Sequence, residues 1–286
     1  MLTSPKKVTQ RFEGTNDWPD WSPDGKYLLY RSDREGADNM SAKSPLCERE
    51  METGEERELF IQLKSSRAHH YSPDGRFVIV QGIDKNDQNG LFQIDIESGQ
   101  TTMLVKCSDD TRIRWATWSP DGNKLFYKYM VTSAQPTRLM QYDLETRQEK
   151  ELFRENSWPT CPALSPDGQW LAFQTLDGEK MIRSLNILPA DSGQLREIVK
   201  LQENEYIHSV DWMPDGKSIL YIKNTPDHPK QRELWQVSIE NGNPRDIGLT
   251  MERMTYLSIH PDGRQIAFSA YKEQTEIWVM ENFLPE

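Results

Sequence analysis

Short apolar segments alternate with polar turns along the whole chain. Six of these segments, each three or four residues long and rich in β-branched and aromatic side chains, occupy positions 27–30, 77–80, 125–127, 171–173, 219–221 and 266–268. Runs of this length and composition, bounded by Gly and Pro, are typical of buried β-strands. The pattern therefore predicts an all-β protein.

A Pro-Asp-Gly turn stands just before each of these segments. Ser precedes the turn in four copies, Met213 in the fifth and His260 in the sixth. Pro presets φ at the first central position of a type I turn, Asp suits the second, and Gly accepts the left-handed conformation that follows. Each copy predicts a tight reversal between two antiparallel strands.

The turn aspartates divide the chain into six units. They lie at positions 24, 74, 121, 167, 215 and 262, so that neighbouring copies are 46 to 50 residues apart. A third strand is expected at 91–94, 139–142, 234–237 and 277–280, and a fourth at 57–60, 102–105, 151–153 and 197–199. Four antiparallel strands in each of six units predict a six-bladed β-propeller, with residues 1–286 as a single domain.

The last unit is incomplete at its carboxyl end, because the chain stops just after its third strand. Residues 7–12, ahead of the first unit, resemble the fourth strands of the other units. We expect this amino-terminal strand to complete blade six and to close the ring, which removes the open sheet edges that promote aggregation.

The charge balance excludes some classes of partner. Lys and Arg total 34 and Asp and Glu total 45, which gives a net charge of −11. A general nucleic-acid binder needs a cationic surface to replace phosphate counterions, so nucleic acid is not an expected partner. No apolar run approaches the roughly 20 residues needed to cross a bilayer, so membrane insertion is not expected either.

The amino terminus and the cysteines bear on the compartment. Two lysines near the amino terminus have no apolar segment behind them, so no secretory signal is expected. Cys47, Cys107 and Cys161 lie more than fifty residues apart and form no C-x-x-C pair, so neither a disulfide framework nor a zinc site is indicated. We expect a cytoplasmic protein, or a periplasmic one if a leader has been removed.

The repeated phrase Trp/Tyr-Ser-Pro-Asp-Gly-Lys/Arg-x-Leu/Ile resembles the WD-like propeller repeat of the TolB carboxyl-terminal domain and its relatives. Those relatives include the propellers of tricorn-type and prolyl-oligopeptidase-type peptidases. The resemblance covers residues 5–286 and implies the propeller fold, but not an activity, because this repeat is a scaffold for many tasks. Neither the α/β domain of TolB nor the hydrolase domain of the peptidases has a counterpart here, and the stretch 33–45 departs from the repeat pattern of blade one.

Signatures of catalysis and of cofactor binding are missing from the sequence. There is no G-x-S-x-G, G-x-G-x-x-G or H-E-x-x-H motif. The five histidines form no cluster with metal-ligand spacing, and neighbours such as His69 and His70 point to opposite faces of a strand. We therefore assign no catalytic residue, no metal and no cofactor.

The segments that lead into the first strand of each unit are the best candidates for a binding site, because they ring one mouth of the central channel. They are rich in arginine and aromatic side chains, which anchor interfaces and stack on flat or anionic groups. The candidate residues are Asp17, Trp18, Arg67, Arg112, Arg114, Trp115, Trp158, His208, Arg253 and Tyr256. For Trp18, Trp115 and Tyr256, packing between blades is an alternative interpretation.

Residues that recur at one position of every repeat are expected to be structural. Trp21, Tyr71, Trp118, Leu164, Trp212 and Ile259 lie three positions before each turn aspartate, where blades pack on each other.

We expect a monomeric, non-catalytic binding module for a protein, a peptide or a small anionic ligand. Two alternatives stay open. One is a lyase or hydrolase acting in the channel through His208, His70, Asp17 or Asp211, and the other is the sensor domain of a longer regulatory protein.

Overall fold

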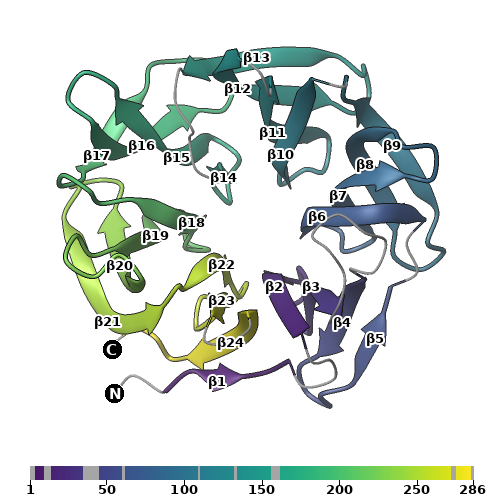
Figure 1. The fold of residues 1–286 in the computed structure, drawn as a ribbon, viewed down its shortest axis with the longest axis horizontal. Coiled ribbons are helices and arrows are strands. Elements are labelled where there is room, and N and C mark those ends of the chain that lie inside the picture. The colour runs from purple at the N-terminus through teal and green to yellow at the C-terminus, as the bar shows by residue number, and fades with distance from the viewer. Residues whose placement is uncertain are drawn as a thin grey trace.

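The computed structural model describes residues 4–9, 14–34, 45–59, 62–108, 110–131, 134–155, 162–271 and 275–284. Over these ranges the chain forms six four-stranded antiparallel sheets and no helix, arranged as blades around a central axis (Figure 1). Accordingly, this part of the chain holds no helix that could cross a membrane. The predicted six-bladed β-propeller is confirmed.

Each blade contributes one strand to the wall of the channel, and the chain then runs outward strand by strand. Blade one consists of β2 (Gly14–Trp21), β3 (Tyr27–Arg34), β4 (Leu46–Glu50) and β5 (Glu56–Glu58). Blade two consists of β6 (Leu63–Tyr71), β7 (Phe77–Asp84), β8 (Asn89–Asp95) and β9 (Thr101–Lys106). Blade three consists of β10 (Thr111–Trp118), β11 (Lys124–Val131), β12 (Ala134–Asp143) and β13 (Glu149–Glu155).

The second half of the ring repeats this order. Blade four consists of β14 (Ala163–Leu164), β15 (Trp170–Asp177), β16 (Ile182–Pro189) and β17 (Arg196–Lys200). Blade five consists of β18 (Ile207–Trp212), β19 (Ser218–Asn224), β20 (Gln231–Ser238) and β21 (Pro244–Glu252). Blade six consists of β22 (Thr255–Ile259), β23 (Gln265–Tyr271), β24 (Thr275–Glu281) and the amino-terminal β1 (Lys6–Lys7).

The amino-terminal segment closes the ring, as the sequence predicted. In β1, Lys6 pairs with Val279 and Lys7 with Trp278, and the Val8 N–H donates to the Ile277 carbonyl at 3.1 Å. The pairing therefore involves residues 6–8, at the start of the predicted strand 7–12, and positions 10–12 of that strand lie outside the described residues.

The Pro-Asp-Gly turns are built alike in all six blades. In each, the Gly N–H donates to the carbonyl three residues earlier, at 2.8–2.9 Å. In four turns the Ser hydroxyl also donates to the Asp carboxylate, at 2.5–2.7 Å. These hydrogen bonds stabilise the ionised carboxylate, and for Asp24, Asp74 and Asp121 they lower its pKa.

Blades pack on each other through the residues three positions before the turn aspartates. Five of the six, all except Leu164, are buried. Two of the tryptophans also link neighbouring blades, because Trp118 Nε1 donates to the His70 carbonyl at 3.3 Å and Trp212 Nε1 to the Ala163 carbonyl at 3.0 Å. The predicted packing role is confirmed for these five residues, whereas Leu164 is half-buried.

Blade one has its third strand, β4, although most of the unusual stretch 33–45 lies outside the described residues. Cys47 in this strand and Cys107 after β9 are buried and form no disulfide with a described residue, and Cys161 lies outside the described residues.

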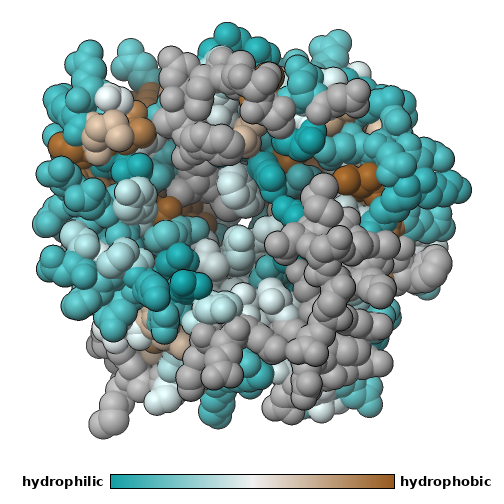
Figure 2. Space-filling view, viewed as in Figure 1, coloured by the Kyte–Doolittle hydropathy of each residue, from teal (hydrophilic) through white to brown (hydrophobic). Residues whose placement is uncertain are grey.

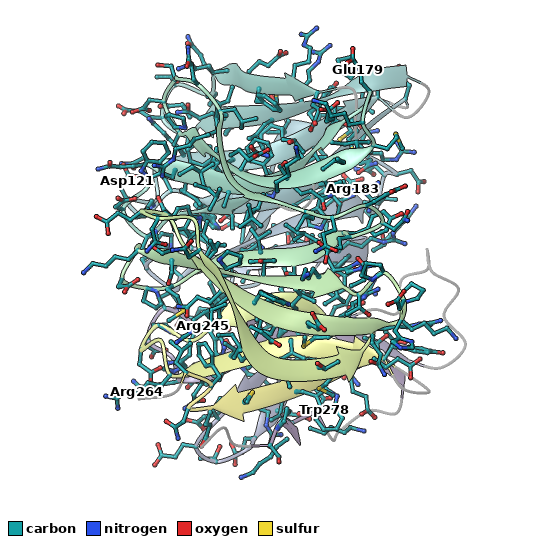
Figure 3. The ribbon with its side chains drawn as sticks, turned by 90° about the vertical axis from the view of Figure 1, so that its left-hand side faces the viewer. Asp121, Glu179, Arg183, Arg245, Arg264 and Trp278 are labelled. Carbon is teal, nitrogen blue, oxygen red and sulfur yellow. The ribbon has the colours of Figure 1, made fainter. Side chains whose placement is uncertain are left out.

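The two faces of the ring differ in the turns that they carry. Figure 3 shows Asp121 and Arg264, from two Pro-Asp-Gly turns, on one face and Glu179, from the β15–β16 turn, on the other. We call the face with the Pro-Asp-Gly turns the turn face. We call the opposite face the mouth face, because the innermost strands begin on it. These strands are β2, β6, β10, β14, β18 and β22.

Candidate functional site

A basin of about 590 Å³ opens at the mouth face, where the innermost strands begin. Its charged and titratable side chains are Asp17, Lys128, His208, Arg232 and Arg253. Its aromatic side chains are Trp115, Tyr206, Tyr256 and Tyr271. Figure 2 views this face, which is mainly hydrophilic at its edge and of intermediate hydropathy around its centre.

The one acidic side chain of the basin among the described residues is already neutralised. Arg31 Nε and Nη2 donate to the two carboxylate oxygens of Asp17, each at 2.8 Å, and both residues are buried. The Arg31 guanidinium also lies 4.8 Å from the centre of the Trp18 ring. This two-bond pair fixes Asp17, so the carboxylate adds little negative charge to the basin.

Two arginines leave positive charge in the basin. Arg232 Nη1 donates to the Met254 carbonyl at 2.9 Å, and the Arg253 guanidinium lies 4.8 Å from the centre of the Tyr271 ring. Neither forms an ion pair with a carboxylate of the described chain, and Arg232 Nε is buried there without a hydrogen-bond partner. Burial and the charge of Arg253 lower the pKa of Arg232, which is the response expected of a cation in a positive environment.

Lys128 and His208 also line the basin, next to the two arginines. Lys128 is 1% exposed, and its ammonium nitrogen lies 4.6 Å from the centre of the Trp115 ring. Burial, assisted by the charge of Arg232, lowers the pKa of His208 to about 4, so its imidazole is neutral at pH 7. A cationic, ring-lined basin of this kind can accept an anionic group and a flat one beside it.

A smaller inner cavity of about 140 Å³ lies deeper in the channel. One layer of its wall, which we call the polar layer, is made by the residues four positions before each turn aspartate, one from every blade. They are Asp20, His70, Thr117, Ala163, Asp211 and Ser258. The alternation of side chains along a β-strand explains this layer, because one position of the repeat always points to the channel.

An aromatic layer separates the basin from the inner cavity. Trp18, Trp115 and Tyr256, each six positions before a turn aspartate, line the inner cavity, and the latter two line the basin as well. All three adopt a left-handed backbone, with φ of 55°, 50° and 52°, at β-bulges of the innermost strands. Bulges re-aim side chains at some cost in backbone strain, and they are common beside binding sites. The rings of Trp18 and Tyr256 pack edge to face, with their centres 5.0 Å apart.

The titratable groups of the inner cavity interact with one another. His70 Nδ1 lies 3.2 Å from Asp20 Oδ1, while Asp20 Oδ2 accepts the Tyr71 N–H at 2.8 Å. Burial disfavours the charged imidazole, but the charges of Asp20 and Asp211 and the hydrogen bond with Asp20 outweigh it and raise the pKa of His70. Burial also raises the pKa of Asp211 to about 7, against the Ile259 and Trp212 N–H groups that stabilise its carboxylate. This carboxyl group therefore titrates near neutral pH.

The structure brings together part of the predicted mouth. Asp17, Trp115, His208, Arg253 and Tyr256 line the basin, and Trp18 lines the inner cavity. Arg67, Arg112 and Arg114 are half-buried on β6 and β10 and belong to neither wall, and Trp158 lies outside the described residues. That these residues bind a ligand stays a prediction.

The basin also contains residues that the sequence did not single out. Lys128, Arg232 and Tyr271 come from second and third strands, whereas only the segments before first strands were considered. Asp20 was likewise missed, although counting back four positions from each turn aspartate would have found it together with His70 and Asp211.

No metal centre is evident in the parts of the chain that the structure describes, where no group of three or more His, Cys, Asp or Glu side chains could hold an ion.

Two family models match the chain. The model of the TolB β-propeller domain matches residues 115–284, and that of the prolyl oligopeptidase N-terminal β-propeller domain matches residues 2–160.

Sequence relatives do not add an activity. An uncharacterized protein of Agrobacterium fabrum is 24% identical over 266 residues, which are 88% of this chain and 84% of that protein. An uncharacterized peptidase of Bacillus subtilis is 28% identical over 160 residues, which are 54% of this chain but 21% of the peptidase.

Solved structures share the fold. A putative TolB from Agrobacterium tumefaciens is 19% identical with a TM-score of 0.72, over 98% of this chain and 93% of that one. An oligogalacturonate lyase in complex with manganese is 15% identical with a TM-score of 0.68, over 100% of this chain and 97% of that one. Identities this low establish a common architecture and not a common task. The family models, the six blades and the Pro-Asp-Gly turns together show that this chain belongs to the TolB β-propeller family.

Proposed function

We propose that this propeller is a binding module that holds an anionic group of a peptide, a protein or a small ligand in the basin of its mouth face. One observation carries the proposal, namely that Arg232 and Arg253 face the basin without an ion pair to a described carboxylate. Buried or half-buried cations are normally paired, because desolvation of an unpaired charge is costly. An anion in the basin would supply the missing partner.

The aromatic side chains of the basin support the same proposal. Trp115, Tyr206, Tyr256 and Tyr271 provide flat apolar surface next to the cations. Aromatic and arginine side chains at the centre of a contact carry much of the energy of protein and peptide binding. The preferred ligand is therefore a carboxylate with a flat or apolar group beside it, as at the carboxyl terminus of a peptide.

Substitution of Arg253 tests this function. The probes are a pool of tripeptides with free termini and the same pool with amidated carboxyl termini, and binding is followed by ligand-observed NMR. We expect Arg253→Ala to weaken binding of the free-carboxylate pool about tenfold or more, since charge-assisted hydrogen bonds contribute roughly 1.5–3 kcal/mol each.

The matched control is Arg264→Ala, which removes an exposed arginine from the turn face (Figure 3). This variant should bind as the wild type does. Equal binding of the two pools by the wild type would reject the basin as an anion site.

Acid–base catalysis in the inner cavity is a second candidate function. It is favoured by one observation, the pKa of about 7 for Asp211 beside His70, since such a pair can exchange protons at neutral pH. The similar proteins include an oligogalacturonate lyase and a peptidase, so uronate oligosaccharides and peptides are the substrates to test. Turnover by the wild type that Asp211→Asn abolishes would support this candidate, and absence of turnover by the wild type would reject it.

A further inference from the structure

The inner cavity has the opposite electrical character to the basin. Its polar layer contains two carboxyl groups, Asp20 and Asp211, and a single basic group, His70, which is hydrogen-bonded to Asp20. The cations Lys128, Arg232 and Arg253 belong to the wall of the basin and not to that of the inner cavity. A ligand that passes from the basin into the channel therefore moves from a positive into an acidic environment.

The polar layer can accept more hydrogen bonds than it now makes. Asp211 Oδ2 accepts the Ile259 N–H at 2.9 Å and Oδ1 accepts the Trp212 N–H at 2.8 Å. Each carboxylate oxygen has two acceptor sites, so each of these oxygens retains one. The hydroxyl oxygens of Thr117 and Ser258 lie in the same layer. Such a set of acceptors matches an ammonium group, which has three donors and no acceptor.

His69 adds an uncharged side chain to the cavity wall. This residue lines the cavity and is 2% exposed. Burial lowers the pKa of its imidazole to about 3, so it carries no positive charge that would repel an ammonium group.

Aromatic side chains also line the inner cavity. They are Trp18, Trp115 and Tyr256. The rings of Trp18 and Trp115 already contact the protein cations Arg31 and Lys128, at 4.8 and 4.6 Å, so they offer a guest apolar surface rather than a further cation site.

The dimensions select the size of the guest. A cavity of about 140 Å³ is comparable to cavities that hold one benzene-sized group, enough for an ammonium, its carbon and a small side chain. His208 in the basin and Asp211 in the inner cavity are three residues apart on β18, which at the usual rise of a strand is roughly 10 Å. An extended peptide of about three residues spans this distance.

We propose that the inner cavity binds the free amino terminus of a short peptide, with Asp211 as its main partner, while the carboxyl end lies in the basin. This inference rests on the proposed function of the basin and adds the polarity and length of the ligand. The peptide enters amino terminus first, past Trp115 and Tyr256.

The pH dependence of binding follows from the groups that face Asp211. These are His70 on β6 and Asp20 on β2, together with the N–H groups of Ile259 and Trp212. As the pH rises through about 7, Asp211 loses its proton and becomes a better partner for an ammonium group. Above about pH 8 the α-amino group of the peptide is itself deprotonated, so binding declines again.

The experiment compares three pools of tripeptides on the wild-type protein by ligand-observed NMR: free termini, acetylated amino termini and amidated carboxyl termini. We expect acetylation to weaken binding at least tenfold and amidation to weaken it independently. If acetylation has no effect while amidation weakens binding, the proposed binding of the amino terminus in the inner cavity is wrong, and the proposed binding of the carboxylate in the basin is supported. If neither modification matters, or no pool binds, both proposals are wrong.

Two variants test whether Asp211 is the residue that binds the amino terminus of the peptide. Asp211→Asn keeps a carbonyl acceptor for one of the two N–H groups and should remove the preference for a free amino terminus. Arg253→Ala is the matched control, since it should remove the preference for a free carboxylate and leave the preference for a free amine. If Asp211→Asn keeps the full preference for a free amino terminus, the assignment to Asp211 is wrong.

Discussion

The turn face and the mouth face of this propeller use the same repeat in opposite ways. On the turn face, six Pro-Asp-Gly turns repeat the same backbone hydrogen bond, and four repeat the same Ser–Asp bond. Toward the mouth face, equivalent positions carry different side chains, such as Trp18, Ala68 and Ser209, all six residues before a turn aspartate. Identical positions maintain the ring, and variable positions give the channel its chemistry.

The difference also appears in the electrostatics. The turn carboxylates of Asp24, Asp74 and Asp121 have lowered pKa values because hydroxyl and N–H groups stabilise their charge. In the channel, Asp211 has a raised pKa because burial penalises its charge. The direction of the pKa shift therefore distinguishes the aspartates that stabilise the turns from the candidate functional aspartate in the channel.

Loss of the closing strand should have the largest effect, since both faces depend on the ring. Deletion of residues 1–9 removes the β1–β24 pairing, the Val8 hydrogen bond and the packing of Val8 against blade six. These contacts sum to several kcal/mol, so we expect the melting temperature to fall by roughly 10 °C or more. Differential scanning calorimetry measures the change.

Lys7→Ala is the control for this deletion. It removes the Lys7–Glu276 ion pair, whose lysine is exposed, and leaves the backbone pairing. Such ion pairs contribute roughly 0–1 kcal/mol, so the melting temperature should change little. An unchanged melting temperature in the deletion variant would contradict ring closure by this segment.

Two glycine substitutions test how uniform the turn face is. Gly25 and Gly122 both have φ near +72°, so Ala at either position should cost about 1–2 kcal/mol. At Gly25 an added Cβ would also lie 2.2 Å from His260 Nε2, which contacts the Gly25 carbonyl at 3.1 Å, whereas the space beside Gly122 is open. Gly25→Ala should therefore lower the free energy of unfolding by about 1 kcal/mol more than Gly122→Ala does. Equal losses in urea titrations would show that the His260 contact contributes nothing.

The smallest change in the free energy of unfolding is expected from the titration of Asp211. The ordinary pKa of an aspartate side chain is 3.8 and that of Asp211 in the folded protein is about 7, so between these values the folded state binds more protons than the unfolded state. The free energy of unfolding contributed by this group therefore falls as pH rises from 4 to 7. Relative to the wild type, Asp211→Asn should gain about 1–2 kcal/mol between pH 6 and 8. A stability difference independent of pH would contradict the raised pKa.

Much of the fold was predictable because the repeat is nearly regular. The even spacing of the turn aspartates determines the number of blades, and the β-branched and aromatic segments after them form the second strands. The fourth strands show the limit of this inference, because β17 has five residues and β21 has nine at the same position of the repeat. Local patterning indicates where a strand occurs, but its length depends on neighbours that are distant in sequence.

The candidate site was predictable only in part. Residues of the first strands, such as Trp115 and Tyr256, could be assigned to the mouth because their position in the repeat determines their place. Lys128 and Arg232 could not, because a residue on a second or third strand reaches the basin only through the packing of a long side chain. Arg114 shows the converse, since it pairs with Lys128 across β10 and β11 but does not line the basin.

The pairing of β1 with β24 has a practical consequence for anyone who immobilises the protein. Both strands lie at the outer rim of blade six, away from the central channel (Figure 1). A tether attached through either strand would hold the disc by its edge, so surface-based assays and fused reporters would leave the entrance to the channel accessible to solution.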